Sequence, residues 1–219
     1  MTPNEIINEL ELEINTTGNI ADAIEEVTGA RGWMAADMKP IFTSRIVGQA
    51  ATVLMRPLLN NDATNYPNKA LELLDEAPEG SILIYVMQDS VDIAAMGDLM
   101  GATAKIRGIK GAVIDGAVRD ISQLKKIGFP VWSRRVTPAS LVGRMVAVDK
   151  QVQVKCGDVI VNPGDYVICD LDGVVVIPEK EILKVIDKLR IYAKKEEKIL
   201  EIILKEKSIL KALEEFKRY

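Results

Sequence analysis

The order of hydrophobic and polar positions divides the chain into stretches with different periods. Between residues 4 and 14 the apolar residues recur at helical spacing, and this pattern predicts a short amphipathic helix. The polar run 15–19 interrupts the pattern, and a second helix is expected over residues 20–27.

Residues 46–133 alternate between strand-like and helix-like patterns. Runs rich in β-branched residues predict strands, and the segments between them predict short helices. The polar segment 60–67 is expected to be a loop. The expected strands are 46–55, 81–87, 111–115 and 131–133, and the expected helices are 70–74, 97–107 and 121–127. This alternation favours an α/β arrangement.

After residue 144 the apolar runs become short, and turn signals at 162–165 (NPGD) and 170–173 (DLDG) separate them into β-segments. Residues 179–219 contain neither Gly nor Pro and carry many charges. Their apolar positions have helical spacing over 182–203, and a last short helix is expected over 209–216. That apolar stripe has to pack on its own domain or on a neighbouring subunit.

Composition narrows the class of protein. The 219 residues carry a net charge of −4, and this mild acidity argues against a nucleic-acid partner. No apolar run approaches the length of a membrane span, and the acidic N-terminus is unlike a signal peptide, so we expect a cytoplasmic protein without a membrane partner. The two cysteines, Cys156 and Cys169, form no metal-binding pattern.

The chain contains no histidine, and this absence excludes several kinds of active site. Ser-His-Asp and Cys-His nucleophilic sites, histidine acid–base catalysis and zinc sites with histidine ligands are all ruled out. Any catalysis has to use carboxylates, Arg, Lys, hydroxyls, backbone amides or a metal held by oxygen.

Two segments carry the candidate chemistry: residues 96–101 (MGDLMG) and residues 114–120 (IDGAVRD). Taken singly, Asp98 could be a helix N-cap, and Arg119 with Asp120 could be a surface pair. Taken together, they place helix N–H groups, a guanidinium and carboxylates in loops that follow strands, where ligands of α/β sheets bind. Such a set suits metal-assisted chemistry on a small 2-oxo acid.

The segment GDLMGATAKIRGIKGAVIDGAVRD, followed by IGFPVWSRRVTP, resembles the family that includes regulator of ribonuclease activity A and the 4-hydroxy-4-methyl-2-oxoglutarate aldolases. Twenty residues separate Asp98 from Arg119, as in that family's motif. The resemblance extends over about residues 18–177 and includes RIVGQAATV at 45–53. In one respect the chain departs from its relatives, because residues 88–90 (QDS) stand where glycines are usual.

The resemblance implies a swivelling β/β/α-type domain, layered sheets with flanking helices, that assembles into a homotrimer or a dimer of trimers. It places the catalytic domain at residues 1–178, and a C-terminal helical extension at 179–219 that packs on a neighbouring subunit. The family's aldolases depend on Mg²⁺ or Mn²⁺. They cleave 4-hydroxy-2-oxo dicarboxylic acids to pyruvate and a second 2-oxo acid, and they decarboxylate oxaloacetate.

The resemblance also assigns expected roles to residues of this chain. Asp120 is expected to be the direct metal ligand, and Arg119 to bind the pyruvyl group and stabilise its enolate. Asp98 is expected to hold a metal-bound water. The substrate carboxylate would bind at the start of the helix, on the backbone of Gly97, Asp98, Leu99 and Met100. From the tail of an adjacent subunit, Glu197 is the expected catalytic acid, with Glu196 as the alternative.

Three alternatives remain open at this point. One is a metal-binding oligomer with residual oxaloacetate decarboxylation and an unrelated cellular role. A Schiff-base aldolase would use Lys105 or Lys110, although both lie in polar stretches typical of solvated side chains. A non-catalytic regulator would bind a ribonuclease, as the founding branch of the family binds ribonuclease E, or another protein. The long tail and the Arg119-Asp120 pair favour the enzyme.

Overall fold

The structure is a computed structural model that describes residues 1–42, 44–59 and 68–216. Its N-terminal helices are α1 (Pro3–Leu10) and α2 (Thr17–Thr28). A capping box begins α1, because Thr2 and Glu5 exchange hydrogen bonds between side chain and backbone. Helix α1 ends at Leu10, four residues earlier than the apolar pattern suggests. Helix α2 ends at Thr28, and its C-cap, Gly29, has the left-handed conformation.

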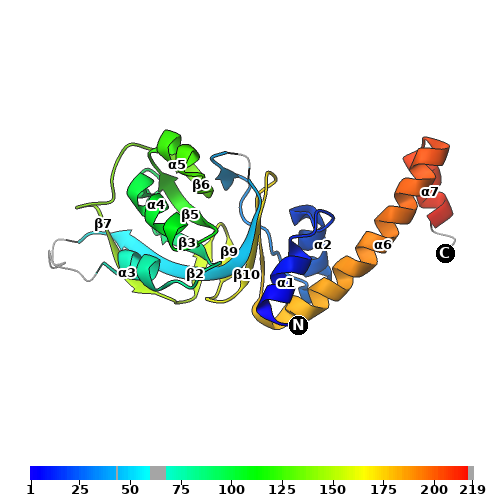
Figure 1. The fold of residues 1–219 in the computed structure, drawn as a ribbon, viewed down its shortest axis with the longest axis horizontal. Coiled ribbons are helices and arrows are strands. Elements are labelled where there is room, and N and C mark those ends of the chain that lie inside the picture. Colours follow the sequence, from blue (N-terminus) through cyan, green and yellow to red (C-terminus); the bar gives the residue numbers. More distant parts are fainter. Residues whose placement is uncertain (43, 60–67, 217–219) are drawn as a thin grey trace.

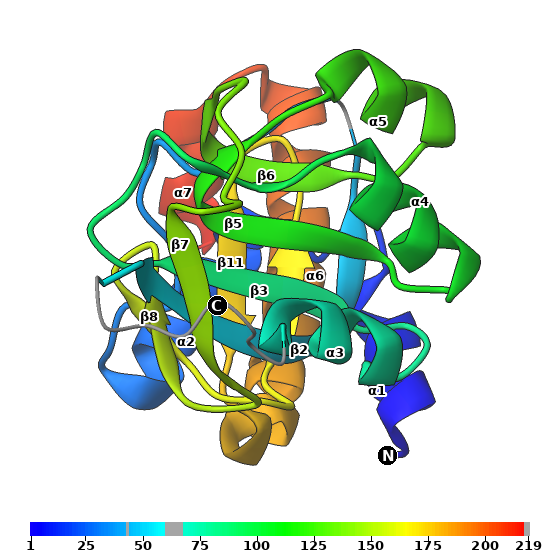
Figure 2. The same cartoon turned by 90° about the vertical axis from the view of Figure 1, so that its left-hand side faces the viewer.

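A curled nine-stranded sheet forms the body of the molecule, in the order β1-β6-β5-β3-β2-β10-β11, with β4 paired to β5 and β7 paired to β2 (Figure 2). The strands are β1 (Lys39–Pro40), β2 (Ile46–Pro57), β3 (Ile82–Met87), β4 (Ala94–Met96), β5 (Gly111–Val118), β6 (Val131–Val136), β7 (Met145–Lys150), β10 (Tyr166–Cys169) and β11 (Val174–Ile177). Strand β2 has 12 residues and joins β10, β3 and β7 into one sheet.

Strands β2, β3, β5 and β6 run parallel, so their carboxyl ends meet at one edge of the sheet. Helices α3 (Lys69–Glu76), α4 (Asp98–Ile106) and α5 (Ile121–Ile127) cover one face of this region (Figure 2). Buried Leu73, Tyr85 and Leu124 belong to the core between these helices and the sheet. A second core around Trp132 fills the other face, beneath the hairpin of β8 (Val154–Cys156) and β9 (Val159–Val161).

A third core ties the C-terminal tail to the body. After a 3₁₀ turn at Glu179–Glu181, helix α6 (Ile182–Glu206) packs its first turns against α1, α2 and the β10–β11 hairpin through buried Val185 and Leu189. Ion pairs from Lys188 to Glu26 (2.5 Å) and from Arg190 to Glu9 (2.9 Å) reinforce this contact. The rest of α6 extends away from the body, and α7 (Ile209–Phe216) folds back beside it (Figure 1).

Most of the predicted elements are confirmed, and residues 121–127 and 209–216 form helices with the expected bounds. The short strands β1 and β4 were not predicted. The expected loop at 60–67 lies outside the described residues. Cys156 and Cys169 are buried free thiols, and burial raises the pKa of both well above the ordinary value. Within the described ranges, no helix has the length and apolar character needed to cross a membrane.

Candidate active site

The unpredicted strand β4 brings the two candidate segments together. It runs parallel to β5 with Met96 opposite Val118, so both strands end at the same level of the sheet. The backbone N–H of Arg119 donates to the carbonyl oxygen of Met96 at 3.1 Å. The residues that follow β4, Gly97 and Asp98, therefore lie beside Arg119 and Asp120.

Asp120 has an unusual backbone conformation and an unusual partner. Its φ is 58°, in the left-handed region, and it occupies the N-cap position of α5 without capping that helix through its side chain. Its carboxylate faces α4 instead, where Oδ2 accepts a hydrogen bond from the backbone N–H of Asp98 at 3.3 Å. The positive end of the α4 dipole favours this negative charge. A sparsely populated backbone conformation held at a helix terminus is typical of a functional site.

Arg119 completes the pair, with its Nε 3.3 Å from Oδ2 of Asp120. Both side chains are partly exposed, at 41% for Arg119 and 36% for Asp120. The guanidinium and the carboxylate are therefore both accessible to a small ligand.

Gly97 is required for this close packing. A Cβ at this position would lie 2.4 Å from Oδ2 of Asp120 and 3.0 Å from Nε of Arg119. The backbone at Gly97 is extended, with φ −133° and ψ −166°, so its conformation alone would admit other residues. The need for glycine arises from the space that Arg119 and Asp120 occupy.

The start of α4 differs in one detail from the sequence expectation. Asp98 is the first residue of the helix, with Gly97 in the cap position, and its Oδ1 accepts a hydrogen bond from the Leu99 amide at 2.8 Å. The Leu99 N–H that was expected to bind the substrate carboxylate is thus engaged in this state. A ligand that uses this amide has to displace the Asp98 side chain from it.

A cavity of about 220 Å³ opens beside these residues. Arg119 is the one cation that lines it among the described residues. The cavity also has lining residues that the sequence did not indicate, contributed by α3, by β4 and by the loop before β7. Its lining consists of Asn68, Ala70, Leu71, Ala94, Ala95, Met96, Gly97, Asp98, Leu99, Met100, Arg119, Ser140, Leu141 and Val142.

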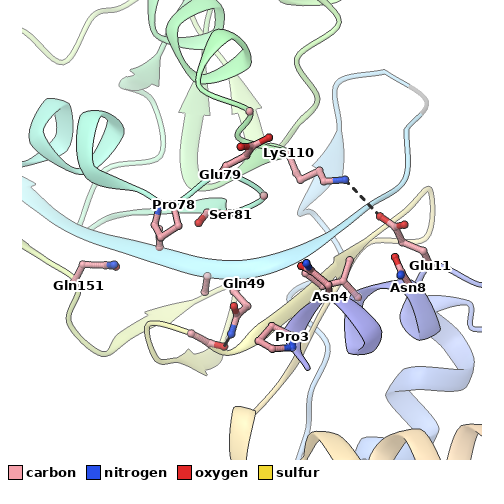
Figure 3. A pocket seen from close by; sticks show the side chains of 16 residues that line it. Pro3, Asn4, Asn8, Glu11, Gln49, Pro78, Glu79, Ser81, Lys110 and Gln151 are labelled. Carbon is pink, nitrogen blue, oxygen red and sulfur yellow. Dashed lines mark hydrogen bonds and ion pairs between the residues drawn. The ribbon is translucent and has the colours of Figure 1, made fainter. Parts of the chain in front are cut away.

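A larger pocket, of about 610 Å³, lies at the opposite ends of the strands (Figure 3). Its lining includes Ser81 and Lys110, which immediately precede β3 and β5, and residues of α1. Lys110 points toward Glu11 across this pocket, with 3.6 Å between Nζ and Oε1 (Figure 3). Ligands of open α/β sheets bind at the carboxyl ends of the strands, so the smaller cavity is the candidate active site.

The lysines of the competing Schiff-base mechanism do not line the candidate cavity. Lys110 lines the pocket at the opposite edge, and Nζ of Lys105 donates to the carbonyl of Gly128 at 3.3 Å. Neither side chain is placed to attack a ketone held by Arg119.

The tail acids lie far from the candidate site within one subunit. Figure 1 places α6 on the opposite side of the molecule from α4 and α5. Oε2 of Glu196 accepts a hydrogen bond from Nδ2 of Asn19 at 3.2 Å, whereas Glu197 is exposed. Glu197 can therefore serve the site only in a neighbouring subunit.

The described residues contain no group of three or more Asp, Glu, Cys or His side chains that could hold a metal ion. The site offers Asp120 with Asp98 beside it. This donor set fits Mg²⁺, because Mg²⁺ is usually bound through one or two carboxylates and keeps several waters or substrate oxygens.

Comparisons with known proteins identify sequences and structures that are similar to this chain. A family model described as "RraA-like: Aldolase/RraA" matches residues 17–176. A protein of Halalkalibacterium halodurans named "Putative 4-hydroxy-4-methyl-2-oxoglutarate aldolase" is 31% identical over 172 residues, which cover 78% of this chain and 76% of that protein. The solved structure of an uncharacterized protein from Pseudomonas syringae pv. tomato has a TM-score of 0.85 and 29% identity, covering 96% of this chain and 94% of that one.

A relative from Legionella pneumophila, named Protein DlpA, is much longer. It is 28% identical over 201 residues, which cover 91% of this chain. The match spans only 32% of the Legionella protein.

Proposed function

The chain belongs to the RraA-like family, and on that premise we propose that it is a divalent-metal-dependent aldolase. It cleaves 4-hydroxy-2-oxo acids to pyruvate and a second carbonyl compound. The observation that carries the proposal is that Arg119 and the N-terminus of α4 line one cavity, and that the Asp120 carboxylate contacts both of them. The named substrate of relatives, 4-hydroxy-4-methyl-2-oxoglutarate, and oxaloacetate are the first compounds to test.

Arg119 and the N-terminus of α4 supply the binding groups. A guanidinium grips a carboxylate with two parallel hydrogen bonds, and the positive end of a helix dipole favours anions. As the C3–C4 bond of the substrate breaks, negative charge develops on the C2 oxygen. Arg119, fixed beside Asp120, stabilises this enolate because its donors are already in place.

Asp98 is the residue placed to handle protons. Its carboxylate lines the cavity, and Oδ1 is held by the Leu99 amide. Oδ2 can then take up the proton of the substrate C4 hydroxyl, directly or through a water, since the chain has no histidine for this role.

A divalent cation, Mg²⁺ or Mn²⁺, would be held by Asp120, with Asp98 close by. When bound there, it would supply Lewis-acid polarisation of the ketone oxygen. The Asp98 amide and the Arg119 guanidinium hold the Asp120 carboxylate in position.

We also propose that the site is shared between subunits of a trimer or a dimer of trimers, with Glu197 supplied by the neighbour. The outer part of α6 carries the exposed side chains Leu200 (55%) and Leu204 (71%), which one subunit leaves uncovered. In this proposal residues 1–178 form the catalytic domain, and the extension beyond them reaches the adjacent subunit. The first turns of α6 belong to the core of their own subunit.

The test is a steady-state assay of pyruvate release from oxaloacetate and from 4-hydroxy-4-methyl-2-oxoglutarate. We expect turnover with Mg²⁺ or Mn²⁺ and its loss after treatment with EDTA. Absence of turnover with every divalent metal would contradict the proposal. It would favour a binding role, such as that of the ribonuclease regulators in the family.

A further inference from the structure

Three exposed aliphatic side chains from separate elements line the candidate cavity. Leu71 comes from α3, Leu99 from α4 and Val142 from the loop that precedes β7. Their exposed fractions are 44%, 79% and 75%. Exposed apolar groups gathered around one opening commonly mark a binding site. We call these three residues the apolar rim.

The charged residues that line the cavity limit the number of carboxylates it can bind. Among the described lining residues the single cation is Arg119, and Asp98 is the acid. The remaining polar side chains, Asn68 and Ser140, are neutral. Arg119 already lies 3.3 Å from Asp120 and is needed for the pyruvyl end of the substrate. A second substrate carboxylate would meet aliphatic groups and the Asp98 carboxylate, and no further cation among the described lining residues would offset its loss of hydration.

We propose that the preferred substrate carries an uncharged aliphatic substituent on C4, where the substrate named for relatives carries its second carboxylate. This inference rests on the proposed aldolase activity and narrows it. The occupant of the apolar rim is then the alkyl group of a 4-hydroxy-2-oxo monocarboxylic acid. The site is contiguous with Arg119 and the N-terminus of α4, which hold the other end of the same molecule.

The reaction balances without any further reactant. The C4 hydroxyl loses its proton as the C3–C4 bond breaks, and C4 becomes the carbonyl carbon of an aliphatic aldehyde. The electron pair of the broken bond forms the enolate of pyruvate. That enolate takes a proton at C3, so the products are pyruvate and the aldehyde.

The first measurement compares kcat/KM for pyruvate release from two sets of substrates. The aliphatic set is 4-hydroxy-2-oxopentanoate, 4-hydroxy-2-oxohexanoate and 4-hydroxy-2-oxoheptanoate, and the dicarboxylic set is 4-hydroxy-2-oxoglutarate with its 4-methyl derivative. We expect kcat/KM to rise about fourfold for each added methylene, the equivalent of roughly 0.8 kcal/mol per buried CH₂. We also expect the aliphatic set to exceed the dicarboxylic set.

The second measurement uses a matched pair of variants. Val142→Lys places a cation at the apolar rim, and we expect it to shift the preference at least tenfold toward the dicarboxylic set. Ile106→Lys is the control, since Ile106 is an exposed aliphatic residue of α4 (87%) that does not line the cavity. It should leave the preference unchanged.

The possible results separate this inference from the proposed function. Pyruvate release that favours the dicarboxylic set, with no gain per methylene, would overturn the inference and leave the aldolase activity standing. A Val142→Lys variant that dissociates the oligomer with unchanged preference would show that the rim is a subunit contact, and would also overturn it. Failure to cleave both sets would overturn the proposed function itself.

Discussion

The backbone N–H of Asp98 donates to Oδ2 of Asp120 at 3.3 Å, across 22 positions of the chain. This contact joins the N-terminus of one helix to a carboxylate that sits at the start of the next helix without capping it. Asp120 is thereby held beside Arg119, with its charge balanced by a helix dipole and a guanidinium.

Asp120→Asn should abolish metal-dependent turnover while the fold is retained. Asparagine has nearly the same shape and tolerates the left-handed backbone at this position, where φ is 58°, but it lacks the charge that would hold a cation. We expect kcat/KM to fall by about 10²-fold or more, since loss of even an outer-shell partner of a metal costs about 10–100-fold. Pyruvate release titrated with Mg²⁺ and a circular dichroism spectrum check this. A folded variant with normal turnover at limiting metal would exclude Asp120 as the ligand.

Arg119→Lys should be a poor replacement. Lysine keeps the positive charge but lacks the planar fork that holds a carboxylate and an enolate oxygen together. Removal of one such donor costs about 10²–10³ in rate, and we expect a loss of that size in kcat. The variant and the wild type are compared with oxaloacetate at saturating metal. A change of less than a few-fold would mean that Arg119 has only a structural role.

Gly97→Ala should damage the site far more than the same change at a glycine with space around it. The added Cβ would lie 2.4 Å from Oδ2 of Asp120, so the carboxylate or the helix has to move. A displacement near 1 Å can cost about 10²-fold in rate. Gly18→Ala is the matched control, because its Cβ would meet only Oγ1 of Thr16 at an ordinary 3.6 Å. Equal activity of the two variants would contradict the packing argument.

Two inactive variants should restore each other if the site is shared. Asp120→Asn and Glu197→Ala subunits, unfolded together and refolded, would form some sites in which both residues are wild type. We expect a sizeable fraction of pyruvate release to return in the mixture, compared with each variant refolded alone. A mixed oligomer that stays inactive would refute the contribution of Glu197 from a neighbour. If Glu197→Ala alone is fully active, Glu196→Ala is tested next, although Glu196 is hydrogen-bonded to Asn19 of its own subunit.

Arg134→Met should destabilise the protein. Arg134 contacts both Asp115 and Asp37, and the Arg134 and Asp115 side chains are only 18% and 17% exposed. Loss of a buried partner costs about 3–5 kcal/mol, and we expect about 2–4 kcal/mol here because some solvent reaches the pair. Urea unfolding measures the change. Lys155→Met, which removes a surface pair with Asp158, is the control and should change stability by less than about 1 kcal/mol.

The same variant should also change how the free energy of unfolding depends on pH at acidic pH. The hydrogen bond from Arg134 holds the pKa of Asp37 below its ordinary value. A lowered folded pKa stabilises the protein above the ordinary pKa of an aspartate, and this stabilisation disappears as the pH falls through the folded pKa. In Arg134→Met, the share of the pH dependence of the free energy of unfolding that is due to Asp37 should be absent. Wild-type and variant curves of identical shape below about pH 4 would contradict this assignment.

The sequence alone was sufficient to predict those elements whose structure depends on residues close together along the chain. Apolar spacing and the C-cap glycine, Gly128, define the helix at 121–127, and the β-branched run at 81–87 contains strand β3. The absence of histidine limits the chemistry to carboxylates, Arg and Lys whatever the fold. The segments around Asp98 and Arg119 also stand out in the sequence, because their residue types and spacing are visible there.

Only the tertiary structure decided how those segments meet. Strand β4 has three residues, too few to show a period, yet its pairing with β5 sets Gly97 beside Asp120. The left-handed backbone of Asp120 and the engagement of the Leu99 amide are likewise products of close packing. The apolar rim joins elements distant in the chain, and α6 carries Glu197 away from its own site. Local patterns specify elements, whereas contacts between distant segments depend on the packing of the whole core, and the candidate site is made of such contacts.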